Sequence, residues 1–243
     1  MNEVDIRPLA ERSEAALREP SGLSAAQNVY EALRRRIINL DLEPDRVLNR
    51  RELAAEYGVS LMPIREALQL LEQDGLVRIR PQSGTVVTRI DLAQLRENQF
   101  LRIAVESEVV RQLAATRPEA TLARARAIID MQSVLAGDLA QMDLFTELDR
   151  NFHRTLFEGV GMERLHAMLA RRLGHLTRCQ RLELPRAGKM HEIIAAHSAI
   201  LEGIEAGQAE AAAEAMRRHL TGTIQRLDLL CREHPDFFTP ASV

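Results

Sequence analysis

The chain has 243 residues, which is enough for one small domain and one of ordinary size. Hydrophobic residues make up 46% and aromatic residues 3%, so we expect cores built from Leu, Ala, Ile and Val. The two cysteines are too few for a disulfide framework, and neither a membrane span nor a signal peptide is evident. We therefore expect a cytoplasmic protein that does not enter a membrane. The net charge of -3 argues against a protein that coats polyanions but permits a local DNA-binding face.

The first part of the chain begins with a polar stretch. Residues 1–23 contain two prolines and no sustained apolar stripe, and we expect a flexible arm there. Apolar residues at helical spacing then predict a helix over 24–40, and Pro44 prevents its continuation.

Two short helices separated by a tight turn are predicted next. Asn49 and Glu52 form a capping box for the first, which runs to Tyr57. Ser60 caps the second, which ends at Gly75. Alternating residues then predict strands over 76–80 and 85–89. This order of elements is typical of a winged helix-turn-helix with three helices and a two-stranded wing, and we assign it to residues 24–90.

From residue 91 onward the pattern is helical throughout. We predict an antiparallel bundle of about six helices over residues 91–234, followed by a C-terminal tail over 235–243, so the fold class is mainly α. The predicted helices are 92–116, 119–139, 142–159, 162–184, 187–205 and 208–233.

The second helix of a helix-turn-helix presents its first turns to the major groove of DNA. With Ile64 and Leu68 facing inward, Arg65 and Gln69 lie one turn apart on the exposed face and can reach phosphates or base edges. An alternative is a winged helix that contacts protein and has solvated arginines. The full set of candidate DNA-binding residues is Arg50, Arg51, Ser60, Leu61, Met62, Arg65, Gln69, Gln82 and Ser83.

A second group of candidates lies in the helical region. Asp149 and His153 are four residues apart, so they leave one helix on the same face. His197 and His219 lie on two later helices, and a bundle can direct all four groups to one centre. A carboxylate with imidazoles suits zinc, nickel, manganese or iron. The spacing also permits solvated or hydrogen-bonded histidines with no metal.

Five segments of the first domain resemble the GntR family of bacterial regulators in order and spacing, namely residues 29–34, 51–54, 58–60, 63–68 and 71–77. The resemblance implies that Arg51 and Arg65 contact operator DNA, that the protein is a homodimer on a short palindrome, and that the wing tip enters the minor groove. Leu61 departs from the family, which usually has Arg there, so the operator is expected to differ from the commonest one. Leu61 and Met62 are candidates for contact with thymine methyl groups.

The helical region resembles the C-terminal ligand-binding domain of the FadR subfamily. The matching residues are 101–102 with Glu106, 149–153, 158–161 and 197–220. Metal-binding members of this subfamily use an Asp and a His on one helix and two later His, which implies a divalent metal on Asp149, His153, His197 and His219. Zinc is the first choice, with nickel, manganese or iron as alternatives. The resemblance also implies a small carboxylate effector, which Arg102 would clamp.

These features predict a sequence-specific transcription regulator, and a repressor rather than an activator, that binds double-stranded operator DNA and responds to an organic acid. The rival interpretation is a metal-dependent hydrolase or lyase with secondary DNA binding. No catalytic motif accompanies the metal candidates, so we expect no enzyme. An architectural DNA binder without a ligand would leave the large helical region unexplained.

Overall fold

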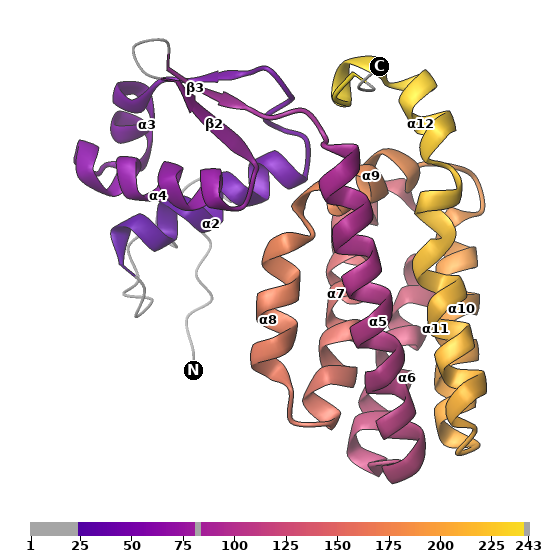
Figure 1. Ribbon diagram of the computed structural model, residues 1–243. Helices are drawn as coiled ribbons and strands as arrows, with labels where there is room; N and C mark the ends of the chain where they lie inside the picture. Colours follow the sequence, from indigo (N-terminus) through magenta and orange to yellow (C-terminus); the bar gives the residue numbers. More distant parts are fainter. Residues whose placement is uncertain (1–23, 81–83, 241–243) are drawn as a thin grey trace, which may run out of the picture.

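The computed structural model describes residues 24–80 and 84–240. A winged-helix region and a helical bundle lie side by side, and the C-terminal segment returns to the point where they join (Figure 1). The mainly helical fold class predicted from the sequence is confirmed. None of the described helices is both long and apolar enough to cross a bilayer. The expected arm over 1–23 lies outside the described residues.

The winged-helix region contains the three predicted helices and a small antiparallel sheet. Its elements are α2 (Ala25–Ile38), β1 (Val47–Leu48), α3 (Arg50–Tyr57), α4 (Leu61–Gln73), β2 (Val77–Arg80) and β3 (Gly84–Val87). The strand order is β1-β3-β2, with Val47 opposite Val86 and Ile79 opposite Thr85. The prediction of two strands missed β1, because two residues are too short to show the alternation of a strand.

The core of this region forms where α2 packs on α4. Leu33 and Ile37 on α2 are fully buried, as are Ile64, Leu68 and Leu71 on α4. All five positions follow helical spacing, so each helix directs one apolar face inward and leaves the other to solvent. The exposed face of α4 is therefore fixed by its buried one.

The predicted caps of α3 and α4 differ in detail from expectation. Asn49 caps α3 by accepting a hydrogen bond from the Arg51 backbone N–H at 2.9 Å. Glu52 accepts from the Asn49 side-chain amide at 3.2 Å, whereas a capping box would bond the backbone of the cap residue. Gly58 ends α3 with a left-handed φ of 63°. Ser60 is the N-cap residue of α4 but makes no side-chain cap bond.

The bundle contains eight α-helices among the described residues. They are α5 (Leu92–Thr116), α6 (Glu119–Leu135), α7 (Met142–Gly159), α8 (Glu163–Arg172), α9 (Gly174–Glu183), α10 (Lys189–Glu205), α11 (Ala209–Gln225) and α12 (Leu227–Glu233), with short 3₁₀ turns at Leu139–Gln141 and Pro235–Phe237. Its main core is aliphatic with two phenylalanines, Phe152 and Phe157. As Figure 1 shows, α5 and α11 run beside each other along the length of the bundle.

Three predicted helices were wrong in their extent. The helix expected over 162–184 is divided into α8 and α9, because the chain bends where Gly174 lies against the winged-helix region. A Cβ on Gly174 would lie 2.7 Å from a methyl carbon of Leu76, so glycine permits this close approach without a shift of Leu76. The helix expected over 119–139 ends at Leu135, before Gly137 with its φ of 89°. The last predicted helix is interrupted at Arg226.

One guanidinium ties α9 to the chain that joins the two regions. The fully buried Arg178 donates to the Thr88 carbonyl oxygen at 2.6 Å and to His175 Nδ1 at 2.8 Å. The Asp91 backbone N–H also donates to His175 Nδ1, at 3.2 Å. Burial and the adjacent Arg178 lower the pKa of His175 to about 3, so the imidazole is neutral and accepts both bonds.

The C-terminal segment secures the same junction from the other side. Ile90 donates its backbone N–H to the Phe237 carbonyl oxygen at 2.7 Å, and its own carbonyl oxygen accepts from the Thr239 N–H at 3.0 Å. Phe238 is buried beside Ile90 in a small apolar cluster. The start of α5 is thus held by α9 and by the end of the chain together.

Candidate metal centre and DNA-reading face

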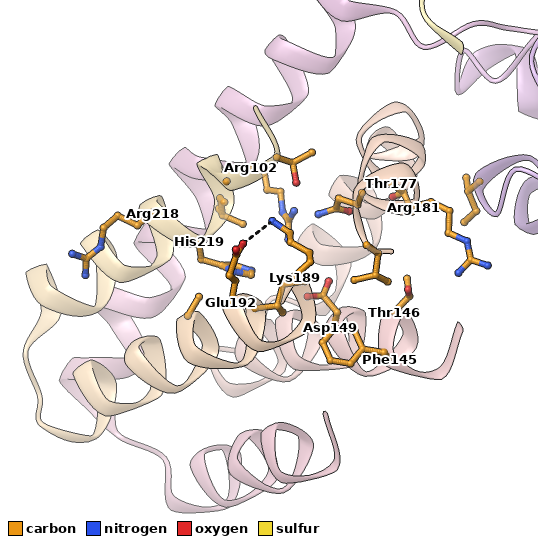
Figure 2. Close-up of a pocket in the computed structure, with 18 of the residues that line it drawn as sticks. Arg102, Phe145, Thr146, Asp149, Thr177, Arg181, Lys189, Glu192, Arg218 and His219 are labelled. Atoms are coloured by element: carbon orange, nitrogen blue, oxygen red, sulfur yellow. Dashed lines mark ion pairs between the residues drawn. The ribbon is translucent and has the colours of Figure 1, made fainter. Parts of the chain in front are cut away.

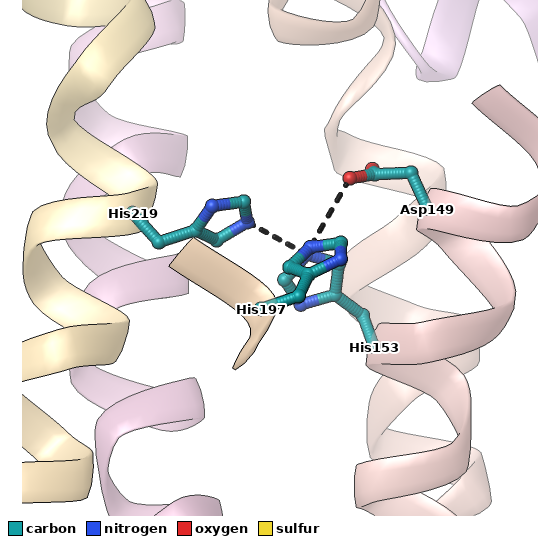
Figure 3. A group of neighbouring side chains, drawn as sticks. All are labelled: Asp149, His153, His197 and His219. Carbon is teal, nitrogen blue, oxygen red and sulfur yellow. Dashed lines mark hydrogen bonds and ion pairs between the residues drawn. The ribbon is translucent and has the colours of Figure 1, made fainter. Parts of the chain in front are cut away.

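Four side chains from three helices meet in the middle of the bundle (Figure 3). Asp149 and His153 come from α7, His197 from α10 and His219 from α11. Each offers a ligand atom, and these atoms all lie within 4.8 Å of one another. The structure therefore brings together all four residues that the sequence proposed as metal ligands.

The closest contacts within this cluster join nitrogen and oxygen atoms that can ligate a metal ion. His197 Nε2 lies 3.4 Å from Asp149 Oδ1, and His153 Nε2 lies 3.2 Å from His219 Nε2. Phe152 stacks on the His197 ring with the centroids 3.9 Å apart, which holds the imidazole from the apolar side. The cluster is thus packed into the core and its polar atoms face one another.

Outer partners orient two of the imidazoles. His153 Nδ1 lies 2.5 Å from Glu106 Oε2, and His197 Nδ1 lies 2.8 Å from Gln132 Oε1. An oxygen acceptor at Nδ1 assigns the proton of a neutral imidazole to that nitrogen and leaves the Nε2 lone pair directed inward. Gln132 was missed by the sequence reasoning, and Glu106 was noted there only as part of a resemblance.

Burial and neighbouring charges set the ionisation of the cluster. Burial would raise the pKa of the Asp149 carboxyl, but the three adjacent imidazoles hold it well below its usual range. Burial lowers the pKa of His197 and of His219, and for His219 the neighbouring His197 and His153 add to the effect. The lowered pKa of Asp149 and the lowered pKa values of His197 and His219 each favour the form of the group that ligates a metal ion.

Arg102 lies at the edge of the same cluster. The residue is only 5% exposed; Nε donates to Glu106 Oε1 at 2.6 Å, and Nη2 donates to His153 Nε2 at 3.0 Å. Arg102 and His153 oppose the effect of burial on Glu106 and hold the pKa of that carboxyl well below its usual range. The guanidinium uses the same His153 lone pair that would ligate a metal, so only one of them can occupy it.

The donor set fits a divalent cation. With its proton on Nδ1, His197 directs an acceptor nitrogen at the Asp149 carboxylate, and a cation between these two groups removes their mutual repulsion. His197 Nε2 is buried and has no hydrogen-bond partner within the described chain. One carboxylate and three imidazoles suit zinc, nickel, manganese or iron rather than calcium or magnesium.

A cavity of about 340 Å³ opens beside the cluster (Figure 2). Asp149 and His219 form part of its wall, and Thr146 and Arg181 line it further along. Its size falls at the lower end of the ~300–1,000 Å³ typical of small-molecule sites. Four cationic side chains and two carboxylates line the cavity, and three of the cations also pair with Glu106, Asp143 or Glu183 outside the lining. The cationic residues are Arg102, Arg181, Lys189 and Arg218, and the carboxylates are Asp149 and Glu192.

The proposed DNA-reading residues lie together on the surface of α3 and α4. All seven that the structure describes are exposed, and Leu61 and Met62 are 52% and 59% exposed although they are apolar. Within the described chain, Arg51 and Arg65 make no ion pair, so each can meet a phosphate. The seven are Arg50, Arg51, Ser60, Leu61, Met62, Arg65 and Gln69; Gln82 and Ser83 lie outside the described residues.

The winged helix beside a helical bundle places this chain among helix-turn-helix transcription regulators. Residues 25–87 match the model of bacterial regulatory proteins of the gntR family, and residues 99–222 match the FCD domain. The chain belongs to the gntR family, and its helical bundle is an FCD domain.

Known relatives match almost the whole chain. An uncharacterized HTH-type transcriptional regulator in an unstable DNA locus of Streptomyces ambofaciens is 33% identical over 220 residues, 90% of this chain and 92% of the relative. The HTH-type transcriptional repressor RspR of Escherichia coli K12 is 28% identical over 213 residues, 88% of this chain and 93% of the relative. The solved structure of E. coli McbR/YncC superposes with a TM-score of 0.70 at 19% identity, covering 87% of this chain and 99% of that one, and so shares the fold.

The buried Glu106 provides a test of how the cluster is stabilised. Glu106→Ala should lower the free energy of unfolding by about 3–5 kcal/mol, because it leaves the buried Arg102 guanidinium without its counter-charge. Urea denaturation measures the change. The control is Glu108→Ala, an exposed carboxylate on the same helix, which should change stability by about 0.5–1 kcal/mol at most. Equal losses in the two variants would contradict this account of the cluster.

Proposed function

We propose that this regulator is a repressor whose affinity for operator DNA changes when a small organic acid binds at a divalent-metal site in its helical bundle. The observation that carries the proposal is the convergence of four ligand residues, two buried and two half-buried, at the wall of a cavity that several cationic side chains line. We place the protein in the cytoplasm, where it acts as a homodimer on a palindromic operator. The match to regulators over the whole chain favours this function over a hydrolase or lyase.

The DNA-reading surface is the N-terminal half of α4 together with the start of α3. Arg65 and Arg51 contribute positive charge, and the exposed N–H groups of the helix start add a favourable dipole for phosphate. Leu61 stands where the family usually has Arg, so a guanine contact is replaced by an apolar surface. We expect Leu61 and Met62 to contact thymine methyl groups, with the wing following in the minor groove.

Asp149, His153, His197 and His219 would hold the metal, zinc in the first instance. The ion would supply an electrostatic attraction for the carboxylate of the effector. Glu106 and Gln132 keep the imidazoles oriented, and Phe152 excludes water from one side of the His197 ring. Arg102 remains anchored to Glu106 through Nε, so its Nη2 is free to donate to the effector carboxylate instead of to His153.

Helix α9 links the cavity to the DNA-binding region. Thr177 and Arg181 line the cavity, while His175 and Arg178 hold the chain that joins the two regions. A shift of α9 around a bound effector would therefore move the Thr88 carbonyl and the winged helix with it. The effector changes DNA affinity only as far as it binds the two arrangements with different affinities.

Arg65→Ala tests the reading face. The operator dissociation constant should rise about tenfold or more, because the variant loses a charged contact to the DNA. Fluorescence anisotropy with labelled operator at moderate salt measures it. Arg171→Ala, which removes an exposed arginine of α8, is the control and should leave the affinity unchanged. An unaltered affinity in Arg65→Ala would remove this face from the proposal.

Metal analysis of purified protein tests the centre. The wild type should carry about one divalent ion per chain, and the double variant His197→Ala/His219→Ala should carry none, because half of the ligands are gone. Gln132→Ala should weaken metal affinity about 10- to 100-fold, since it removes the group that orients His197. His191→Ala, at an exposed histidine of α10, should retain the wild-type content. The same metal content in the double variant and the wild type would refute the site.

A further inference from the structure

The cavity beside the candidate metal centre is not closed by the helical bundle alone. Ile38 and Asn39, at the C-terminal end of α2 in the winged-helix region, form part of its wall together with Asp149 and His219. A second crevice, between α2 and α7, is lined by Ile38, Asn39 and Thr146 as well. The DNA-binding region thus contributes directly to the space in which an effector would bind.

Helix α7 provides the path between the two ends of the cavity. Phe145 and Thr146 precede Asp149 by four and three residues, so all three side chains leave the same face of the helix. Figure 2 shows these side chains at the same wall of the cavity. The space therefore extends about one helical turn, roughly 5.4 Å, beyond the Asp149 carboxylate. A ligand that consists of little more than one carboxylate would occupy only the end of the cavity next to the candidate metal centre.

Asn39 has a fixed backbone and an amide that is available for bonding. Its N–H donates to the Arg35 carbonyl oxygen at 2.9 Å, and the Leu42 N–H returns to the Arg36 carbonyl oxygen at 3.1 Å. Within the described chain, the Asn39 side chain makes no hydrogen bond. The next residue, Leu40, has a φ of 68°, a left-handed conformation that is costly for a residue other than glycine. The side-chain amide of Asn39 offers a ligand one hydrogen-bond acceptor and two donors.

We propose that the effector site is shared between the two regions, with Asn39 of the winged helix as its distal hydrogen-bonding residue. The ligand class is a hydroxy acid: its carboxylate binds at the Asp149 end, and a hydroxyl group further along its chain bonds the Asn39 amide. This inference rests on the proposed function, because it takes the metal end as the carboxylate anchor. Because the effector contacts the end of α2, its affinity depends on the position of the winged-helix region. Regulation needs such a difference in effector affinity between two arrangements of the protein.

Isothermal titration of the zinc-loaded full-length protein with two probes tests this inference. Acetate supplies only the carboxylate, and D-gluconate supplies a carboxylate with a hydroxylated chain. Gluconate should bind the wild type more tightly than acetate does. In Asn39→Ala its dissociation constant should rise about 3- to 10-fold, the value of one neutral hydrogen bond, while the acetate constant stays within about twofold.

The matched control is Asp41→Ala, an exposed position two residues along that does not line the cavity; both probe affinities should remain at wild-type values. The inference is overturned if gluconate binds no more tightly than acetate, or if Asn39→Ala affects both probes equally or neither. Acetate binding that Asp149→Ala abolishes would leave the proposed function standing in each of these cases. If acetate and gluconate both fail to bind zinc-loaded protein, the proposed function fails and this inference fails with it.

Discussion

The structure depends on a requirement of electrostatics: polar groups brought into the core of a helical bundle must be satisfied there. Three imidazoles and a carboxylate meet among aliphatic side chains, and each unpaired group of this kind costs several kcal/mol. Glu106 and Gln132 satisfy the outer nitrogens of two rings, and Arg102 balances the charge of Glu106. The His197 Nε2 lone pair remains directed at the Asp149 carboxylate, an arrangement suited to a cation.

The same bundle also holds the chain that leads to the DNA-binding region. Arg178 donates to the Thr88 carbonyl, and the backbone of Ile90 is paired with the C-terminal segment, so the connection is held by hydrogen bonds to the backbone. The end of α2 meets the cavity directly at Asn39. Two structural links therefore join the candidate ligand site to the winged helix, one through α9 and one through Asn39 at the cavity wall.

Much of this architecture could be predicted from local signals in the sequence. The apolar face of α4, the glycine after α3 and the spacing of Asp149 and His153 depend on residues close together in the chain, so periodicity and caps were sufficient. The division of α8 from α9 could not be found in that way, because it depends on the approach of Gly174 to Leu76, about a hundred residues earlier.

The sequence predicted the four ligand residues of the candidate site, but it did not predict that Gln132 and Glu106 support them. Gln132 interrupts an apolar stripe that includes Ala125, Ile128 and Ile129, and a polar residue on a buried face is a signal that could have been used. Glu106 follows Arg102 by one helical turn and could have been paired with it. No pattern in the sequence indicated Asn39 as a site residue, because it lines the cavity only when α2 packs near α7.

Diffraction at a metal absorption edge, from crystals of protein purified without chelators, tests the central claim most directly. The account predicts one anomalous peak per chain among Asp149, His153, His197 and His219, about 2.0–2.2 Å from the ligand atoms. It also predicts that Arg102 no longer donates to His153. A peak at any other place in the chain, or well-ordered protein with no peak among these four side chains, would contradict the account.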